Sequence, residues 1–253
     1  MVQQPLIYTA KVCPYAQRSL IALEEAGVKY DRYDIDLADK PSVYNERVNS
    51  ASKVPVLVLN PSDSADNGGV TKDKGTVKLP ESLVISEYIG EEYQSAGLLP
   101  KRRRAKARYY IERFSHIFGP PWILLLYRGK ADSLPSLLSA ISTFQLWLSP
   151  TSGSEDSGPF VFGKQYTLAD LAIAPFIGRL IFFSKRGILD PLGGGDVHKA
   201  LTGGDDIFAR VAQWWEAVST RRSWKSTFNE DIIYKAAKTR QEKVLAERQV
   251  GKQ

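Results

Sequence analysis

A single cysteine, Cys13, stands at the point where a short strand is predicted to pass directly into a helix. Residues 5–9 are apolar and aromatic after an opening proline, which predicts a β-strand. Apolar residues then recur at helical spacing between positions 16 and 23 and stop before Gly27, which predicts an amphipathic helix. Because proline suits the first position of a helix, Pro14 makes Cys13 the expected N-cap residue. The chain therefore has to begin as a strand followed by a helix that carries a thiol at its start.

This position favours a reactive thiol over an inert one. The free N–H groups and the positive dipole end of a helix favour an anion at the N-cap. A thiol in such a place loses its proton more easily, and the thiolate is the nucleophile. The alternative is a buried cysteine that packs as a small hydrophobic residue. The strand-to-helix junction and the following proline argue against that alternative, so we interpret Cys13 as a candidate catalytic residue.

The composition is that of a soluble protein with more than one domain. The chain has 253 residues, of which 43% are hydrophobic, and this length suits two domains. It has no apolar run long enough to cross a bilayer and no signal-peptide pattern before the first predicted strand. One cysteine cannot form an internal disulfide framework. We therefore expect a reducing compartment, the cytoplasm.

The net charge of +6 comes largely from residues 101–108 and from the tail after Lys235. A basic patch can bind nucleic acid or an anionic membrane. These positions lack interleaved stacking aromatics and any groove-reading motif, so a solvated helix face is the favoured interpretation. We expect neither nucleic acid nor a membrane as a partner.

The first third of the chain alternates strands and helices. A second strand is predicted over 28–37, a short helix over 41–49, a strand over 53–59 and another over 76–79, with a polar loop at 60–75 between the last two. An apolar-periodic helix follows from 82 to 93, which gives the order βαβαββα. Pro55 cannot donate to a central ladder, and a cis Val54–Pro55 bond is one device that accommodates it. A linker at 94–100 marks the predicted domain boundary.

Long helical patterns dominate after residue 101. Helices are predicted over 102–128, 134–148, 168–184 and 207–218, with a charged helical C-terminus. Gly119, Pro120 and Pro121 should kink or break the first of them. Thr167 and Asp170 match a variant of the capping box at the start of the helix at 168–184, which is apolar nearly all round and therefore buried.

Three features of the first third could meet one ligand. Cys13 is a thiol partner, and the turn at Val54–Pro55 offers backbone groups to a strand-like peptide. The hydroxyl and free amides at Ser82 can hold a carboxylate at a helix start, while Glu81 can take an ammonium group. A ligand with a thiol, a peptide backbone and an α-amino-acid head group would use all three, and glutathione has those parts.

Several motifs in the same order resemble the glutathione transferase family over essentially the whole chain. They are Cys13-Pro14-Tyr15-Ala16, Lys40-Pro41, Lys53-Val54-Pro55-Val56-Leu57, Glu81-Ser82 and Thr167-Leu168-Ala169-Asp170. The Cys-Pro-Tyr-Ala motif is similar to that of the omega class, and the 60–75 insertion resembles fungal members. The resemblance implies an α/β plus all-α fold, with a thioredoxin-like, glutathione-binding domain at 1–93 and an all-helical domain at 101–253. It also implies a cytosolic homodimer.

The resemblance assigns roles residue by residue. Cys13 is expected to form a mixed disulfide with glutathione, and Lys40 to reach the glycyl carboxylate. Val54, fixed by a cis Pro55, is expected to pair with the cysteinyl backbone of glutathione. Glu81 and Ser82 are expected to bind the γ-glutamyl end. The hydrophobic second-substrate pocket of the helical domain is expected to include Phe176 and Arg179 from the family pattern and, from the apolar helix face near Gly119, Tyr15, Phe118 and Trp122.

The absence of a second cysteine at position 16 limits the chemistry to one thiol. Glutathione is therefore expected as co-substrate, and a second glutathione frees Cys13 by thiol–disulfide exchange. Together with one thiol, the resemblance implies a thiol transferase, a dehydroascorbate reductase or a reductase of glutathionylated substrates that serves xenobiotic detoxification. His116 and His198 belong to no metal-ligand cluster, so no metal is expected. The alternatives are a carrier of hydrophobic small molecules such as polyphenols, and a transferase-like interaction module.

Overall fold

The computed structural model describes residues 4–61, 77–148, 150, 153, 157–204 and 206–250. The chain divides into two compact units, one of Met1–Leu99 with Arg222–Phe228 and one of Pro100–Arg221 with Asn229–Gln253. The first unit thus includes a segment that the sequence prediction assigned to the helical domain. Most of the predicted insertion at 60–75 lies outside the described residues.

The first unit has the predicted order of strands and helices. Its elements are β1 (Leu6–Thr9), α1 (Pro14–Glu25), β2 (Asp31–Asp34), α2 (Ser42–Arg47), β3 (Val56–Leu59), β4 (Val77–Pro80), α3 (Ser82–Glu92) and α9 (Arg222–Thr227). The sheet order is β2-β1-β3-β4, with β1 parallel to β2 and the other pairs antiparallel. This is the thioredoxin-like arrangement, and the βαβαββα prediction is confirmed. The second strand is shorter than predicted.

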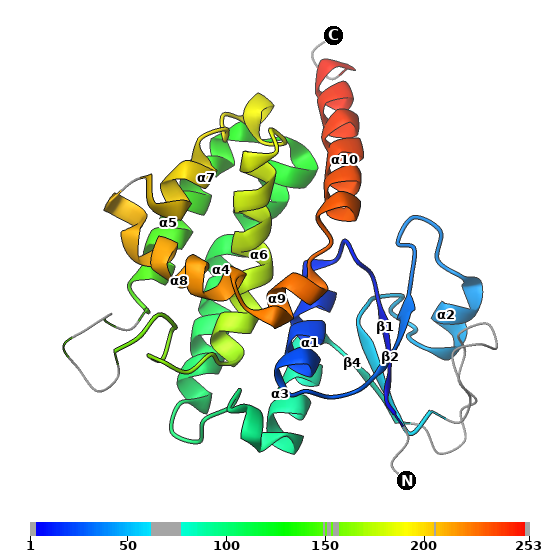
Figure 1. Cartoon of the computed structure of the whole chain (residues 1–253). Coiled ribbons are helices and arrows are strands. Elements are labelled where there is room, and N and C mark those ends of the chain that lie inside the picture. Colours follow the sequence, from blue (N-terminus) through cyan, green and yellow to red (C-terminus); the bar gives the residue numbers. More distant parts are fainter. Residues whose placement is uncertain are drawn as a thin grey trace. The chain divides into compact units, whose positions relative to one another are not determined.

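The two faces of this sheet are both covered by helices (Figure 1). Leu6 and Tyr8 of β1 and Val56 of β3 form one hydrophobic cluster with Tyr44 of α2. Because side chains alternate along a strand, the intervening Ile7 points to the opposite face, which α1 and α3 cover, and it is fully buried there. The sheet therefore places the β1–α1 junction and the start of α3 on fixed supports.

Helix α9 joins the first unit through polar contacts with α1. The Gln17 side chain donates to the Thr227 hydroxyl at 3.3 Å, and the Ser223 hydroxyl donates to the Glu25 carboxylate. Both hydrogen bonds connect positions about two hundred residues apart in the sequence. Sequence spacing cannot reveal such a pairing, which is why the segment was assigned to the other domain.

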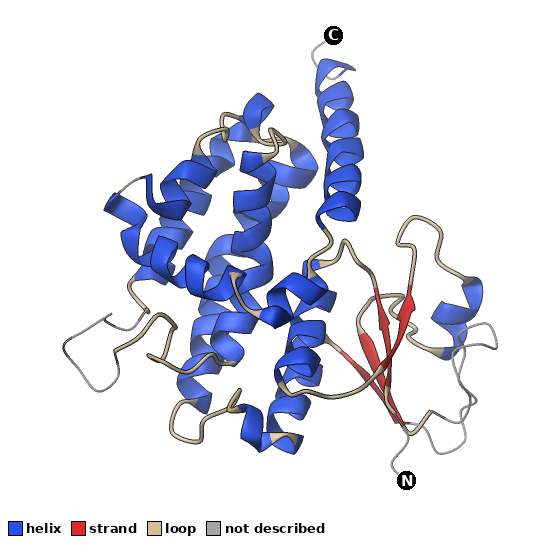
Figure 2. Cartoon of the chain, in the orientation of Figure 1, coloured by secondary structure: helices blue, strands red, loops and turns tan. Residues whose placement is uncertain are grey.

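The second unit is built from helices, and all strands of the described chain lie in the first unit (Figure 2). Its helices are α4 (Arg104–Arg128), α5 (Leu134–Gln145), α6 (Leu168–Lys185), α7 (Val197–Lys199), α8 (Ala209–Ser219) and α10 (Glu230–Val250). Short 3₁₀ turns lie at 131–133, 190–192 and 206–208, and a π turn lies at 200–204. The predicted all-helical C-terminal domain is confirmed.

Helix α4 corrects one sequence prediction. Pro120 and Pro121 lie inside a continuous helix of 25 residues, so of the predicted kink or break the break is wrong, and the kink stays a prediction. Each proline inside a helix removes one helical hydrogen bond, and this costs about 3 kcal/mol in an isolated helix. Here Phe118, Trp122 and Leu125 are buried on both sides of the prolines. Their burial in the core of the unit outweighs the lost hydrogen bonds and keeps the helix in one piece.

Helix α6 begins with the predicted capping box, which the structure confirms. The Asp170 carboxylate accepts hydrogen bonds from the Thr167 backbone N–H and hydroxyl, both at 2.9 Å. It also accepts from the Val161 backbone N–H at 2.9 Å and from the Trp214 indole at 3.0 Å. Burial raises the pKa of Asp170, and these hydrogen bonds act in the opposite direction. The carboxylate thus joins the start of α6, the loop before it and α8.

Candidate functional site

Cys13 lies at the N-cap of α1 with Pro14 at the first helical turn, as the sequence predicts. Its backbone is extended, with φ of −83° and ψ of 119°. The Sγ atom accepts a hydrogen bond from the Ala16 N–H at 3.4 Å, so it uses one of the free donors of the helix start. The side chain is half-buried. This geometry supplies a positive electrostatic environment to a sulfur that solvent can still reach.

A buried cation lies one and a half turns along the same helix. The side chain of Arg18 is 4% exposed, and its Cζ atom lies 5.3 Å from the centre of the Tyr15 ring. Burial lowers the pKa of Arg18 to about 10, and attraction to Tyr15 and Cys13 partly offsets this effect. Arg18 therefore stays positively charged at neutral pH and interacts favourably with negative charge on Cys13.

The turn at Val54–Pro55 contains the predicted cis peptide bond. The segment before it is held by side chains. The Lys40 ammonium donates to the Ser52 carbonyl at 2.6 Å, and the Tyr44 hydroxyl donates to the Lys53 carbonyl at 2.7 Å. Val54 is half-buried and follows these two anchored carbonyls directly. The backbone at Val54 is thus presented from a fixed position.

Glu81 and Ser82 form the start of α3. Glu81 has φ of 72° and ψ of 120°, an unusual backbone conformation for a residue with a side chain. Such a conformation costs about 1–3 kcal/mol and persists where the surroundings impose it, often at ligand-binding sites. Ser82 is buried, and its carbonyl accepts from the Ser86 hydroxyl at 2.8 Å and from the Ser19 hydroxyl at 3.3 Å. The strain at Glu81 points to a functional reason for this turn.

One cavity of about 480 Å³ brings the predicted residues together. Its volume lies in the range of small-molecule sites. The predicted glutathione residues among its lining are Cys13, Lys40, Val54, Pro55, Glu81 and Ser82, and Tyr15 lies beside them. The Lys40 ammonium, the Glu81 carboxylate and the Val54 backbone therefore line the same cavity as the Cys13 thiol.

Four further residues line this cavity that the sequence prediction did not include: Leu37, Asn49, Ser52 and Lys53. Lys53 belongs to the Lys-Val-Pro motif, so its positive charge beside Val54 could have indicated that it lines the site. Asn49 and Ser52 gave no signal because polar residues after a short helix are common. Their place in the cavity follows from the fold of the loop at 49–55, whose hydrogen bonds are made within the loop and with Lys40 and Tyr44.

The other predicted second-substrate residues lie together in the second unit. The Phe118, Trp122 and Phe176 rings pack with centroids 5.5–6.3 Å apart, and all three side chains are buried. Arg179 is 2% exposed, and its guanidinium donates to the Pro175 carbonyl at 3.0 Å. This arrangement is an aromatic core cluster of α4 and α6 with a buried cation beside it. Contact of these residues with a second substrate stays a prediction.

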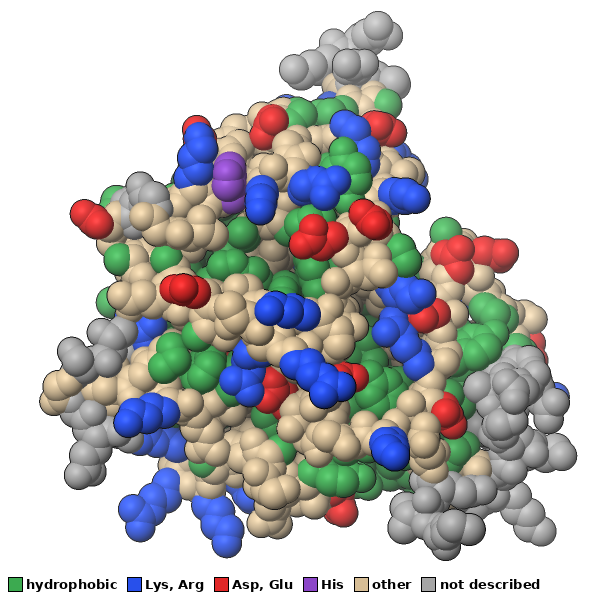
Figure 3. Space-filling view, viewed as in Figure 1, with side chains coloured by type: hydrophobic (Ala, Val, Ile, Leu, Met, Phe, Trp, Pro, Cys, Tyr) green, Lys and Arg blue, Asp and Glu red, His purple; other side chains and the backbone are tan. Residues whose placement is uncertain are grey.

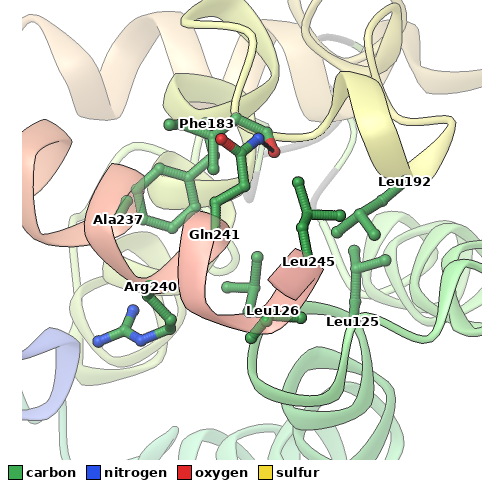
Figure 4. Close-up of a pocket in the computed structure, with 10 residues that line it drawn as sticks. Leu125, Leu126, Phe183, Leu192, Ala237, Arg240, Gln241 and Leu245 are labelled. Atoms are coloured by element: carbon green, nitrogen blue, oxygen red, sulfur yellow. Dashed lines mark hydrogen bonds between the residues drawn. The ribbon is translucent and has the colours of Figure 1, made fainter. Parts of the chain in front are cut away.

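A second cavity lies between α10 and helices α4 and α6 (Figure 4). Its walls are mostly aliphatic and include Leu125, Phe183 and Leu245, with Gln241 and Arg240 from α10 at the rim. Its volume is about 20 Å³, which is enough for about one water molecule. The cavity is therefore a packing defect beneath α10 and is too small for an organic ligand.

Figure 3 shows how charged side chains are distributed on one face of the molecule. There the Lys and Arg side chains are scattered among acidic and neutral ones and do not gather in one patch. Within the part of the chain that the structure describes, no helix is both long and apolar enough to span a bilayer. The same residues contain no group of three or more His, Cys, Asp or Glu side chains arranged to hold a metal ion.

Comparisons with known proteins agree with this geometry. Residues 7–97 match the family model described as the glutathione S-transferase N-terminal domain. The chain is similar to the crystal structure of glutathione transferase Omega 1C from Trametes versicolor, with 34% identity, a TM-score of 0.83 and coverage of 96% of this chain and 98% of that one. It is also similar to Omega 2S from the same organism in complex with 2,4-dihydroxybenzophenone, with 30% identity, a TM-score of 0.78 and coverage of 93% and 98%.

A curated plant relative shows a similar level of identity over a shorter region. Protein IN2-1 homolog B from Oryza sativa subsp. indica is 33% identical over 186 residues, which cover 70% of this chain and 66% of the relative. The match thus spans about two thirds of the relative's length.

Proposed function

Because the chain belongs to the omega class of the glutathione transferase family, we propose that it is a glutathione-dependent thiol transferase with Cys13 as nucleophile. The observation that carries this proposal is the shared cavity, in which a half-buried thiol at a helix N-cap lies with Lys40, Val54 and the Glu81–Ser82 turn.

Glutathione would lie across the cavity in one direction. Its γ-glutamyl ammonium would pair with Glu81, and its γ-glutamyl carboxylate would accept from Ser82 at the start of α3. Its cysteinyl backbone would pair with Val54 in the manner of an added strand. Its glycyl carboxylate would meet the ammonium of Lys40, which retains donors beyond the one given to Ser52. This orientation brings the glutathione sulfur toward Cys13.

The reaction proceeds by two exchanges. The Cys13 thiolate attacks the glutathione sulfur of a mixed disulfide, forms a Cys13–glutathione disulfide and releases the other sulfur as a thiolate. A second glutathione thiolate then attacks the glutathione sulfur of that adduct, forms glutathione disulfide and returns Cys13 as a thiolate. The net reaction converts the mixed disulfide and one free glutathione into glutathione disulfide and the released thiol. Each exchange uses a thiolate as the attacking group, so the proposal assigns no residue as a general base.

The same first step can act on a glutathionylated carbon. Attack on the sulfur then releases the carbon group with the bonding electron pair, and water supplies its proton. Only substrates whose carbanion is stabilised, for example beside a carbonyl group, are expected to react. Dehydroascorbate reduction consumes two glutathione molecules, which leave as glutathione disulfide, and is the third activity that we propose for this site.

The test is the reaction of Cys13 itself. Incubation with glutathione disulfide should produce a glutathione adduct on Cys13 that mass spectrometry detects and that excess glutathione removes. Cys13→Ser should lose mixed-disulfide reduction and deglutathionylation and still bind immobilised glutathione. Full activity of Cys13→Ser would refute the mechanism, and failure of the unaltered protein to bind glutathione would refute the site.

A second function has one specific observation in its favour. The similar Omega 2S structure from T. versicolor was solved with 2,4-dihydroxybenzophenone. We propose that the aromatic cluster of Phe118, Trp122 and Phe176 allows this chain to carry hydroxylated aromatic compounds as well. Fluorescence titration with such compounds should show saturable quenching. Replacement of Trp122 by Ala should weaken that binding and leave glutathione binding unchanged.

We also propose that the protein acts as a homodimer in the cytoplasm, as the family resemblance implies. Light scattering after size exclusion should give twice the chain mass of 28.2 kDa. A fluorescent fusion should follow a cytosolic marker in cells. A monomer or an organellar pattern would contradict these two assignments and leave the catalytic proposal in place.

A further inference from the structure

Two consecutive carbonyl groups next to the proposed peptide-binding residue are anchored by side chains. The Lys53 carbonyl accepts from the Tyr44 hydroxyl at 2.7 Å and from the Asn49 amide at 2.8 Å. The carbonyl before it, of Ser52, accepts from Lys40 at 2.6 Å. Both lone pairs of the Lys53 carbonyl are therefore used by side chains that precede it in the sequence.

Tyr44 is itself held rigidly. It is 2% exposed, and its ring packs edge-on against the Tyr8 ring with centroids 5.6 Å apart. Burial raises the pKa of the Tyr44 hydroxyl, so the group remains a donor. Tyr8 belongs to the central strand β1 of the sheet. The hydrogen bond from Tyr44 thus connects the Lys53 carbonyl to the core of the first unit.

Asn49 is held in place by hydrogen bonds with residues of its own loop. Its Oδ1 atom accepts from the Ala51 N–H at 3.1 Å, and its own carbonyl accepts from the Ser52 N–H at 2.7 Å. Ser52 has φ of 53°, which turns the chain toward Val54. The loop is therefore compact, and its hydrogen bonds all act to direct the backbone that follows.

We propose that Tyr44 and Asn49 are positioning residues of the glutathione site, which hold the Lys53 carbonyl so that the Val54 backbone meets the cysteinyl part of glutathione in register. This inference rests on the proposed function. Pairing with a peptide needs an N–H and a C=O at fixed places, and a shift of about 1 Å is enough to lose much of the benefit. Neither residue is required to touch the reacting sulfur atoms.

The test removes the two donors separately and together. Tyr44→Phe keeps the ring and removes the hydroxyl, and Asn49→Ala removes the amide. All variants are made in a Cys13→Ser background, so that calorimetry measures reversible glutathione binding. We expect each single change to weaken binding about five-fold and the double change about 25-fold, because a group that is no longer held must be ordered when glutathione binds, at a cost of about that factor. Tyr33→Phe is the matched control, because Tyr33 also packs on the Tyr8 ring, at 5.5 Å, and does not line the cavity.

Two further measurements separate positioning from general damage. With Cys13 present, the rate of its alkylation by iodoacetamide should stay unchanged in Tyr44→Phe, because that reaction does not use Val54. The melting temperature should fall no more than in Tyr33→Phe. Amide exchange of residues 52–54 without glutathione should become faster in the double variant.

The outcomes distinguish the two proposals. If Cys13→Ser binds glutathione and the Tyr44 and Asn49 variants bind it equally well, the positioning role is wrong and the proposed function stands. If the rate of Cys13 alkylation and the melting temperature fall together with the affinity for glutathione, Tyr44 and Asn49 have only a structural role and the inference is also wrong. If Cys13→Ser and the unaltered protein both fail to bind glutathione, the proposed function fails and this inference fails with it.

Discussion

Replacement of Asp170 by Ala tests how the second unit is held together. The Asp170 carboxylate is fully buried and receives hydrogen bonds from three N–H groups and one hydroxyl. The three N–H donors belong to Val161, Thr167 and Trp214, and these residues are buried as well. Truncation at position 170 therefore leaves three buried donors without their acceptor.

The size of the effect follows from these contacts. A buried donor left without a partner costs about 1–3 kcal/mol, so three of them give a gross loss of about 3–9 kcal/mol. Two effects reduce this loss. A water molecule can enter the vacated space and accept from some donors. The carboxylate also carries a desolvation cost, visible in its raised pKa, which truncation removes. We expect a net destabilisation of about 3 kcal/mol, equivalent to a fall in melting temperature of about 6–12 °C.

Urea and thermal unfolding followed by circular dichroism and tryptophan fluorescence measure this change. Asp196→Asn is the control, because Asp196 is an exposed aspartate whose contact is a surface ion pair with Lys199 at 2.8 Å. Its melting temperature should match that of the unaltered protein. A melting temperature for Asp170→Ala equal to that of the control would show that the carboxylate does not hold α6, its preceding loop and α8 together.

Three further changes have definite expected outcomes. Gly158→Ala should prevent or severely weaken folding, because a Cβ there would lie 2.3 Å from the Gly163 backbone, and soluble yield with melting temperature measures it. Gly129→Ala should lower the melting temperature by several degrees, because φ is +61° and a Cβ there would lie 2.6 Å from the Val244 side chain on α10. An unchanged melting temperature would mean that Val244 of α10 does not pack against Gly129. Glu81→Gln should weaken glutathione binding about ten-fold in calorimetry at an unchanged melting temperature, because it removes the charge proposed to pair with the γ-glutamyl ammonium of glutathione. Equal affinity would show that Glu81 is not part of the glutathione site.

Local chemistry made much of the first unit predictable. The Cys13–Pro14 pair indicated the N-cap and the first turn of α1, because the missing N–H of a proline costs no helical hydrogen bond at the first position of a helix. The Val54–Pro55 dipeptide in an apolar run indicated an unusual backbone, for which a cis bond was one device, and the structure contains that bond. In the second unit, the capping box at Thr167 was also predictable, because it depends on two residues three positions apart.

Properties that depend on distant contacts were not predictable. The sequence at Gly119–Pro121 favours an interrupted helix, and only the burial of neighbouring aromatic side chains keeps α4 continuous. The same holds for α9, whose hydrogen bonds to α1 span about two hundred residues. The contribution of Asn49 and Ser52 to the cavity wall belongs here too, because it is created by the folding of one loop.

The sequence alone determined that a thiol begins a helix and which residue types could receive glutathione. These are short-range facts, set by the conformational limits of proline and by side-chain chemistry. The family was a resemblance carried by the order of the motifs, and the comparisons with known proteins showed it. Only the tertiary structure decided that Cys13, the anchored Val54 backbone and the strained Glu81 turn share one cavity, because their proximity depends on the packing of β1, β3 and α3 around one sheet.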